Sequence, residues 1–192
     1  MKDRLRETAS DAILDAAEEV AVERGIDAAS IAAIAERAGV AVGTLYNYFP
    51  DRDGILQALL RKRRAEMAPE IAAAATASAD LAFEARLRAY LRGFAAAFDK
   101  RRGYVRIAIS LDQRGQRVHD KEPTLLHLFE RHLADIFKAG ESEGAIPKGR
   151  AGPYATMIAG AMRALKHADL TNDRPMDIDM LVDVFLFGAL AR

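Results

Sequence analysis

Apolar and small side chains recur at helical spacing along most of the chain. In the first segment Ile13, Ala16, Ala17 and Val20 fall on one face, while the other face carries Asp and Glu; this period predicts an amphipathic helix. Gly25 follows the segment as a helix-terminating glycine. Alternating strand patterns are almost missing, and Ala, the strongest helix former, is abundant. We expect an all-α fold, with helices over residues 5–24, 30–38, 41–48, 51–75, 82–100, 104–113, 123–143, 153–170 and 177–191.

The composition narrows the class of protein. The 28 Lys and Arg residues are balanced by 28 Asp and Glu residues, which excludes a polybasic protein that holds nucleic acid by bulk charge alone. The chain has no Cys, and its four His residues lack metal-site spacing, so we expect no metal and no cofactor. No apolar run approaches the ~20 residues that span a bilayer. We expect a soluble cytoplasmic protein without membrane contact.

Residues 30–49, SIAAIAERAGVAVGTLYNYF, have the pattern of a helix-turn-helix. Ser30 is a favourable N-cap, and the segment Ala38-Gly39-Val40 has the usual length and glycine content of the turn. The second helix presents small or neutral hydrogen-bonding groups, which suit a surface that enters the major groove of DNA. A helix exposed only to solvent usually carries Lys and Glu. An ordinary pair of packed helices is the alternative interpretation.

The longer string GIDAASIAAIAERAGVAVGTLYNYFPDRDGILQALL resembles the DNA-binding domain of the TetR family of transcriptional regulators. The preceding segment, residues 12–24, is similar to the first helix of that family. The resemblance covers residues 5–60; beyond them only total length and helical pattern agree. It implies a helix-turn-helix domain at residues 1–50, a connecting fourth helix at 51–75, and a helical effector-binding and dimerisation domain at 76–192.

The same resemblance implies where DNA is contacted. Gly43 matches a position at which a missing side chain allows the helix to approach a base edge or sugar closely. Hydroxyl, backbone or guanidinium groups reach the DNA phosphates at the positions that match Ser30, Thr44, Tyr46, Tyr48 and Arg52. Leu45 and Phe49 match core positions and are not expected to touch DNA.

Base reading rests on two further side chains of the second helix. Val42 suits contact with a thymine methyl group, and Asn47 suits either a bidentate bond to adenine or a contact with phosphate. The basic residues Lys2, Arg4 and Arg6 fit either an arm that reaches DNA or a solvated terminus.

Local sequence also predicts the stability of the helix-turn-helix and the salt dependence of its DNA affinity. Ala41 stands where the family commonly has Ser, and an uncapped helix start costs roughly 0.5–2 kcal/mol. Gly54 weakens the fourth helix by about 1 kcal/mol relative to Ala. Residues 1–64 hold 10 basic and 11 acidic side chains. We therefore expect a mobile reading head that DNA orders, and a modest dependence of DNA affinity on salt.

In TetR-like proteins the central helices enclose a small-molecule pocket. Tyr90, Phe94 and Phe98 share one face of an expected helix, a stripe that is typical both of a core and of a pocket wall. Arg106 would orient a polar ligand if it pointed inward. The pocket candidates are Phe94, Phe98, Tyr104, Arg106 and His127.

In the same family the last two long helices form a dimer interface. The helix expected at 177–191 is apolar around most of its girth, which requires burial on more than one side. We expect Gly188 within this helix to allow close backbone approach. Burial within one subunit is the alternative. The dimer candidates are Tyr154, Ile158, Ala161, Leu165, Leu181, Phe185 and Gly188.

These features predict a homodimeric, ligand-responsive regulator, most often a repressor in this family, that binds a palindromic operator in double-stranded DNA and responds to a small-molecule effector. A DNA-binding adaptor that responds to a partner protein is an alternative. The sequence has no phosphate-binding Gly-Lys-Ser/Thr loop, no Gly-x-Ser-x-Gly motif and no His-Glu-x-x-His motif, so we do not expect an enzyme.

Overall fold

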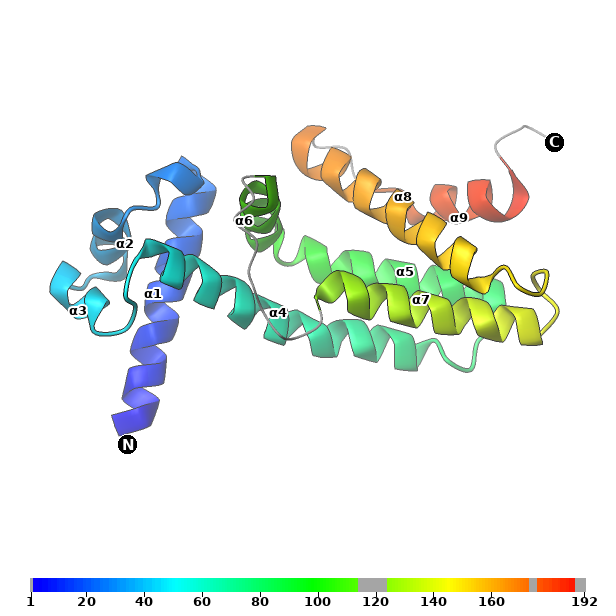
Figure 1. The fold of residues 1–192 in the computed structure, drawn as a ribbon, viewed down its shortest axis with the longest axis horizontal. Coiled ribbons are helices and arrows are strands. Elements are labelled where there is room, and N and C mark those ends of the chain that lie inside the picture. The colour runs from blue at the N-terminus through cyan, green and yellow to red at the C-terminus, as the bar shows by residue number, and fades with distance from the viewer. Residues whose placement is uncertain (1, 114–123, 173–175, 189–192) are drawn as a thin grey trace. The chain divides into compact units, whose positions relative to one another are not determined.

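The chain folds into helices that begin and end largely at the positions expected from local sequence signals (Figure 1). The structure, a computed structural model, describes residues 2–113, 124–172 and 176–188. It has no strand within these ranges, which confirms the all-α prediction. In chain order the helices are α1 (Lys2–Arg24), the 3-10 helix η1 (Ile26–Ala28), α2 (Ile31–Ala38), α3 (Val42–Tyr46), α4 (Arg52–Ala77), α5 (Phe83–Asp99), α6 (Arg102–Gln113), α7 (Leu125–Ser142), α8 (Ala151–Asn172) and α9 (Ile178–Phe187).

The helix boundaries in the first part of the chain have local causes. Gly25, with φ +85°, follows the end of α1, and Gly39, with φ +67°, closes α2 in the left-handed region that favours glycine. The Ser30 hydroxyl accepts a hydrogen bond from the Ala33 N–H at 3.2 Å, which caps α2. At the start of α4 the Gly54 N–H donates to Asp51 Oδ1 at 2.7 Å. Polar caps and glycine turns therefore set the limits of these short helices.

The chain forms two compact units, and the first one is discontinuous in sequence. Unit 1 contains α1 to α3, residues 52–65 of α4, and α6. Helix α1 packs against α2, η1 and α6. Its buried residues Ile13, Ala17 and Val20 belong to the same unit's core as Ile34 and Leu45, which are fully enclosed. A boundary at residue 76 would count α6 with the second domain, whereas its packing places it with α1.

Unit 2 contains the rest of α4 together with α5, α7, α8 and α9. Helix α7 packs against α5 and α8, and α9 packs against α5. A close approach of α7 to α5 requires Gly140, because a Cβ atom there would lie 2.5 Å from Cδ2 of Phe83. Aromatic rings fill much of the interior, among them Tyr90 and Phe129, whose centroids are 5.7 Å apart. None of the described helices is long and apolar enough to cross a membrane.

Candidate nucleic-acid interface

The turn between α2 and α3 is held by backbone hydrogen bonds. The Val40 N–H donates to the Ala35 carbonyl at 3.0 Å, and the Gly39 N–H donates to the Glu36 carbonyl at 3.2 Å. Ala35 is buried, so its small side chain allows the two helices to cross closely. The predicted helix-turn-helix is therefore present, with α3 covering five residues of the longer segment expected.

Helix α3 presents almost all of its side chains to solvent. Leu45 is fully buried and anchors the helix, with Phe49 nearly buried beyond it, as expected for core residues. By contrast Val42 is 42% exposed and Tyr46 is 54% exposed. Gly43, Thr44 and Asn47 are exposed as well, and Tyr48 is half-buried. A single apolar anchor thus holds an outward face of small and neutral groups.

The start of α3 carries no side-chain cap. Ala41 is the N-cap residue, and no side chain hydrogen-bonds to the first turn of the helix. This confirms the uncapped helix start predicted from Ala41. Asn47 is the C-cap residue, so Asn47 and Tyr48, both predicted to contact DNA, lie in the turn that follows the helix.

Arg52 has a structural role besides the phosphate contact that the resemblance implies. Its Nε donates to the Ala29 carbonyl at 2.9 Å, and its Nη2 donates to the carbonyl of Ile26. The guanidinium therefore holds η1 and the start of α2 against α4. Its Nη1 is not used in these bonds and lies 3.4 Å from Asp53 Oδ1, so the phosphate contact of Arg52 stays a prediction.

The acidic face of α1 is paired with basic side chains from α2 and α4. Arg37 Nη1 lies 2.9 Å from Glu19 Oε2 and 2.9 Å from Glu23 Oε1. The bond from Arg37 lowers the pKa of Glu23, and the two carboxylates raise the pKa of Arg37. On α4, Lys62 Nζ lies 2.6 Å from Oδ1 of Asp11 on α1.

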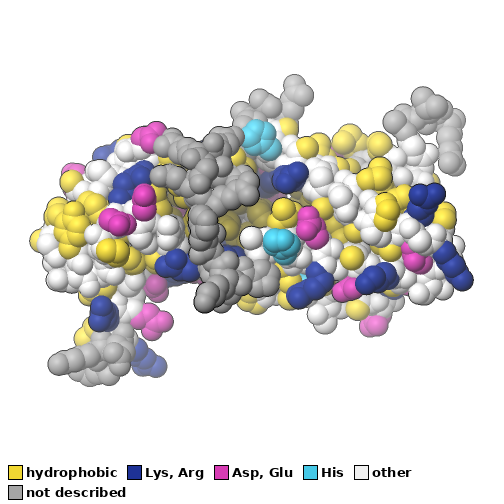
Figure 2. All heavy atoms as spheres, in the orientation of Figure 1, with side chains coloured by type: hydrophobic (Ala, Val, Ile, Leu, Met, Phe, Trp, Pro, Cys, Tyr) yellow, Lys and Arg dark blue, Asp and Glu magenta, His cyan; other side chains and the backbone are white. Residues whose placement is uncertain are grey.

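A second α4 residue completes this pairing. Arg63 bonds Glu18 at 2.7 Å and Asp15 at 2.6 Å. These partners are far apart in sequence, so sequence reasoning missed them; the acidic positions of one α1 face were the available signal. Arg37, Lys62 and Arg63 are therefore engaged inside unit 1, and the surface near α3 in Figure 2 is mainly hydrophobic and neutral.

The five pocket candidates do not form one group within either unit. Phe94 and Phe98 lie in unit 2, with ring centroids 4.6 Å apart, and Phe94 also stacks on Phe129 at 3.9 Å. Tyr104 is buried in unit 1. Arg106 is exposed rather than inward, because the buried positions 104, 107 and 111 of α6 define its other face.

The remaining pocket candidate also lies on the surface. His127 is exposed, and its Nδ1 lies 2.8 Å from the Thr124 hydroxyl at the start of α7. The ring therefore belongs to the N-terminal capping arrangement of that helix. A polar pair that the sequence did not single out lies deeper in unit 2, where the Tyr90 hydroxyl is 3.2 Å from Nδ1 of His132.

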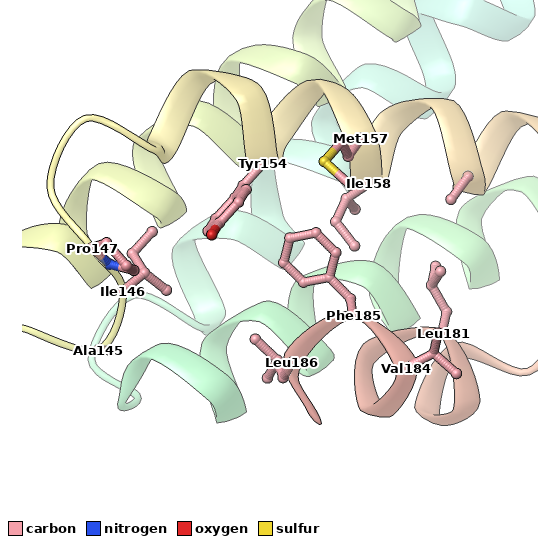
Figure 3. Close-up of a pocket in the computed structure, with 11 residues that line it drawn as sticks. Ala145, Ile146, Pro147, Tyr154, Met157, Ile158, Leu181, Val184, Phe185 and Leu186 are labelled. Carbon is pink, nitrogen blue, oxygen red and sulfur yellow. The ribbon is translucent and has the colours of Figure 1, made fainter. Parts of the chain in front are cut away.

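The dimer candidates on α8 and α9 meet at an apolar groove of about 500 Å³ (Figure 3). Tyr154 and Phe185 contact each other edge to face, with centroids 5.3 Å apart. Met157 and Val184 rise beside them and are 60% and 45% exposed. Of the predicted residues the groove is lined by Tyr154, Ile158, Ala161, Leu181 and Phe185.

The last two dimer candidates lie outside the groove lining. Leu165 is half-buried further along α8. Gly188 has φ +90° and is the C-cap of α9, so it ends the helix and does not provide the close approach expected inside it. Residues 189–191 of the expected helix lie outside the described part of the chain.

A cap-defined helix-turn-helix with an exposed neutral helix, flanked by α1 and α4, defines the class of helix-turn-helix regulatory proteins. Comparison with known proteins agrees with this class. Residues 13–59 match the family of bacterial regulatory proteins described as tetR family. The helix-turn-helix segment of this chain is therefore that of the tetR family.

Individual relatives and structures show how far the similarity extends. The HTH-type transcriptional regulator BetI of Cronobacter sakazakii is 37% identical over 81 residues, which is 42% of this chain and 40% of BetI. The chain thus aligns with about two fifths of the length of this curated relative.

Similarity of fold extends over nearly the whole chain. The fatty acid degradation regulator FadR from Bacillus halodurans is 21% identical, with a TM-score of 0.72, and 95% of this chain and 97% of that chain are covered. FadR from Bacillus subtilis in complex with stearoyl-CoA is 20% identical, with a TM-score of 0.68, over 93% and 98% of the two chains.

Proposed function

We propose that the protein is a homodimeric, ligand-responsive transcriptional repressor that binds a palindromic operator in double-stranded DNA. The observation that carries this proposal is the outward face of α3. Buried Leu45 holds this helix in place, while its exposed positions carry neither Lys, Arg, Asp nor Glu. Such a surface can pack against base edges and the DNA backbone without the free-energy cost of removing charged side chains from water.

The proposed DNA contacts divide into two kinds. Val42 and Asn47 face base edges, and Gly43 allows the helix to approach them. Phosphates accept hydrogen bonds from the exposed or half-buried hydroxyl groups of Ser30, Thr44, Tyr46 and Tyr48. In a dimer, two such helices would enter successive major grooves about 34–36 Å apart.

The apolar groove between α8 and α9 supports the dimer. Met157, Val184 and Phe187 are large apolar side chains with about half of their surface in solvent. Exposed apolar groups gathered beside a groove are typical of an interface between subunits. A second copy of the chain, with its own α8 and α9, would cover them in a self-complementary arrangement.

The proposed effector is a small molecule bound in unit 2 against the aromatic stripe that includes half-buried Phe98. A long-chain acyl-CoA is the first probe, because the B. subtilis FadR structure is described as a complex with stearoyl-CoA. An effector that favours the DNA-incompetent state would shift the population away from DNA. A partner protein in place of the effector is the alternative.

Footprinting on DNA selected from the source genome tests the proposal. We expect one protected region with two-fold symmetry, and its loss when a bound effector is present. A protein that binds no DNA sequence preferentially over random duplex would contradict the proposal. Binding to DNA without a response to any metabolite, but with a response to a partner protein, would favour the adaptor alternative.

A further inference from the structure

A basic side chain at the start of α1 lies over an aromatic ring at the end of the helix-turn-helix. Cζ of Arg6 is 5.9 Å from the ring centroid of Tyr48, a distance typical of a cation–π interaction. The first turns of α1 extend beyond α2 and α3 (Figure 1). The Tyr48 ring therefore connects the first turns of α1 to the segment that follows α3.

Arg6 and Tyr48 share a shallow recess of about 350 Å³ with Ser10 and Glu7. Arg6 and Ser10 are four residues apart on α1 and so lie on one helix face. The guanidinium and two hydroxyl groups are all hydrogen-bond donors. Glu7 is the one acidic member of the recess, and its carboxylate opposes an anion bound there.

Arg6 differs from Arg37, Lys62 and Arg63 of unit 1 in its partners. Arg37, Lys62 and Arg63 form ion pairs with carboxylates of α1. Within the described part of the chain Arg6 forms no ion pair, and it is exposed. A guanidinium that lies over a ring keeps its N–H edges available, and these edges match the oxygen atoms of a phosphate.

We propose that Arg6 and Ser10 of α1, together with the hydroxyl of Tyr48, form a binding site for one phosphate of the DNA backbone. This inference rests on the proposed function and extends the interface from α3 to the first turns of α1. The cation–π contact orients Arg6, because a planar group over a ring loses less conformational freedom on binding than a free side chain. Glu7 weakens the site and limits its affinity for free anions.

The test compares the affinity of full-length variants for the selected operator and for a random duplex over a range of salt concentrations. Arg6→Ala should weaken binding to both DNAs and reduce the salt slope by about 1 per subunit, or about 2 for a dimer. The loss of DNA affinity caused by Arg6→Ala should then be about 16-fold smaller at about 200 mM salt than at about 50 mM salt. Arg24→Ala is the matched control, because Arg24 is an exposed arginine at the other end of α1.

Two further variants give results that a general loss of charge would not produce. Glu7→Gln should tighten binding to both DNAs by removing the opposing carboxylate. Arg6→Lys should keep the salt slope but bind more weakly than the wild type, since an ammonium group neither stacks on Tyr48 nor forms two parallel bonds. Far-UV circular dichroism and urea unfolding confirm that each variant is folded.

The outcomes separate this inference from the proposed function. If the wild-type protein selects an operator but Arg6→Ala has the same affinity and salt slope as Arg24→Ala, the phosphate site is wrong and the regulator remains. An unchanged affinity for Glu7→Gln would also overturn the site. If the wild-type protein selects no operator, the proposed function fails first.

Discussion

Arg63 on α4 binds Glu18 on α1, with 2.7 Å between Nε and Oε2. Both side chains are largely removed from solvent, at 16% and 17% exposure. Arg63 also reaches Asp15 at 2.6 Å. The basic run at residues 61–64, which has the composition of a DNA-binding patch, therefore contributes at this position to the packing of α1 against α4.

Replacing Arg63 should lower the stability of the protein. In Arg63→Ala, largely buried Glu18 loses a charged donor while Asp15 is exposed to water, so we expect the free energy of unfolding to fall by about 2 kcal/mol, mainly through Glu18. Urea unfolding followed by circular dichroism measures the change. Arg61→Ala is the control, because Arg61 is exposed, and it should change stability by less than about 0.5 kcal/mol. Equal losses in the two variants would contradict the role assigned to Arg63.

Two substitutions on the reading face should separate phosphate contact from base reading. Tyr46→Phe removes a hydroxyl from each subunit and should weaken binding to operator and random DNA alike, by about tenfold for a dimer. Asn47→Ala should relax the preference at one base pair if the amide reads adenine, with about 1–3 kcal/mol of discrimination lost. A uniform loss in Asn47→Ala would instead assign Asn47 to phosphate. Binding to a library of single-base operator variants measures both.

Gly43→Ala should separate folding from DNA binding. A Cβ at Gly43 meets no atom of the chain within 4 Å, so the change should raise the stability of α3 through helix propensity by up to about 1 kcal/mol. The added methyl group would instead meet DNA and weaken operator binding. Thermal unfolding and a binding titration should therefore change in opposite directions. Unchanged affinity would remove Gly43 from the interface.

Met157→Lys should convert the proposed dimer to a monomer, because it places a charge in the apolar surface beside the α8–α9 groove. Size-exclusion chromatography with light scattering measures the mass. Leu81→Lys is the matched control, since Leu81 is 41% exposed and lies outside α8 and α9. A dimer that survives Met157→Lys would place the interface elsewhere.

His132 should make stability depend on pH. Burial lowers the pKa of His132, nearby Arg131 lowers it further, and Asp135 partly opposes this shift. Below the ordinary value of 6.5 the unfolded chain binds a proton that the folded protein resists, so stability should fall as the pH decreases through that value.

Urea unfolding from pH 8 to pH 5 tests this dependence. His132→Gln should flatten the part of the profile near neutral pH. Tyr90→Phe removes the hydroxyl bonded to the ring but leaves the ring half-buried as before, so it should retain the wild-type slope. A flat profile in the wild-type protein would contradict the prediction.

Local signals explain which parts of this structure the sequence could predict. Ser30 and Gly39 act on residues within four positions of themselves, so the limits of α2 follow from the sequence alone. Arg52 and Arg63 act on residues 23 to 48 positions away. Their partners depend on the packing of whole helices, and sequence patterns could give them only a local role.

The position of α6 shows the same limit. Its apolar face predicts a helix but does not specify which helices will cover it. In the structure Gly103 lies so near α1 that a Cβ would be 2.7 Å from Cγ2 of Val22. This contact requires the tertiary fold.

The packing of α6 on α1 has a consequence for the order of folding during synthesis. Unit 1 needs residues 101–113, yet all of α4 and all of α5 leave the ribosome before them. Unit 1 therefore cannot complete its core while only the N-terminal part of the chain has been synthesised. A fragment that ends at residue 65 would expose the α1 surface that α6 covers. We expect the protein to become able to bind DNA late in translation, after α6 has packed against α1.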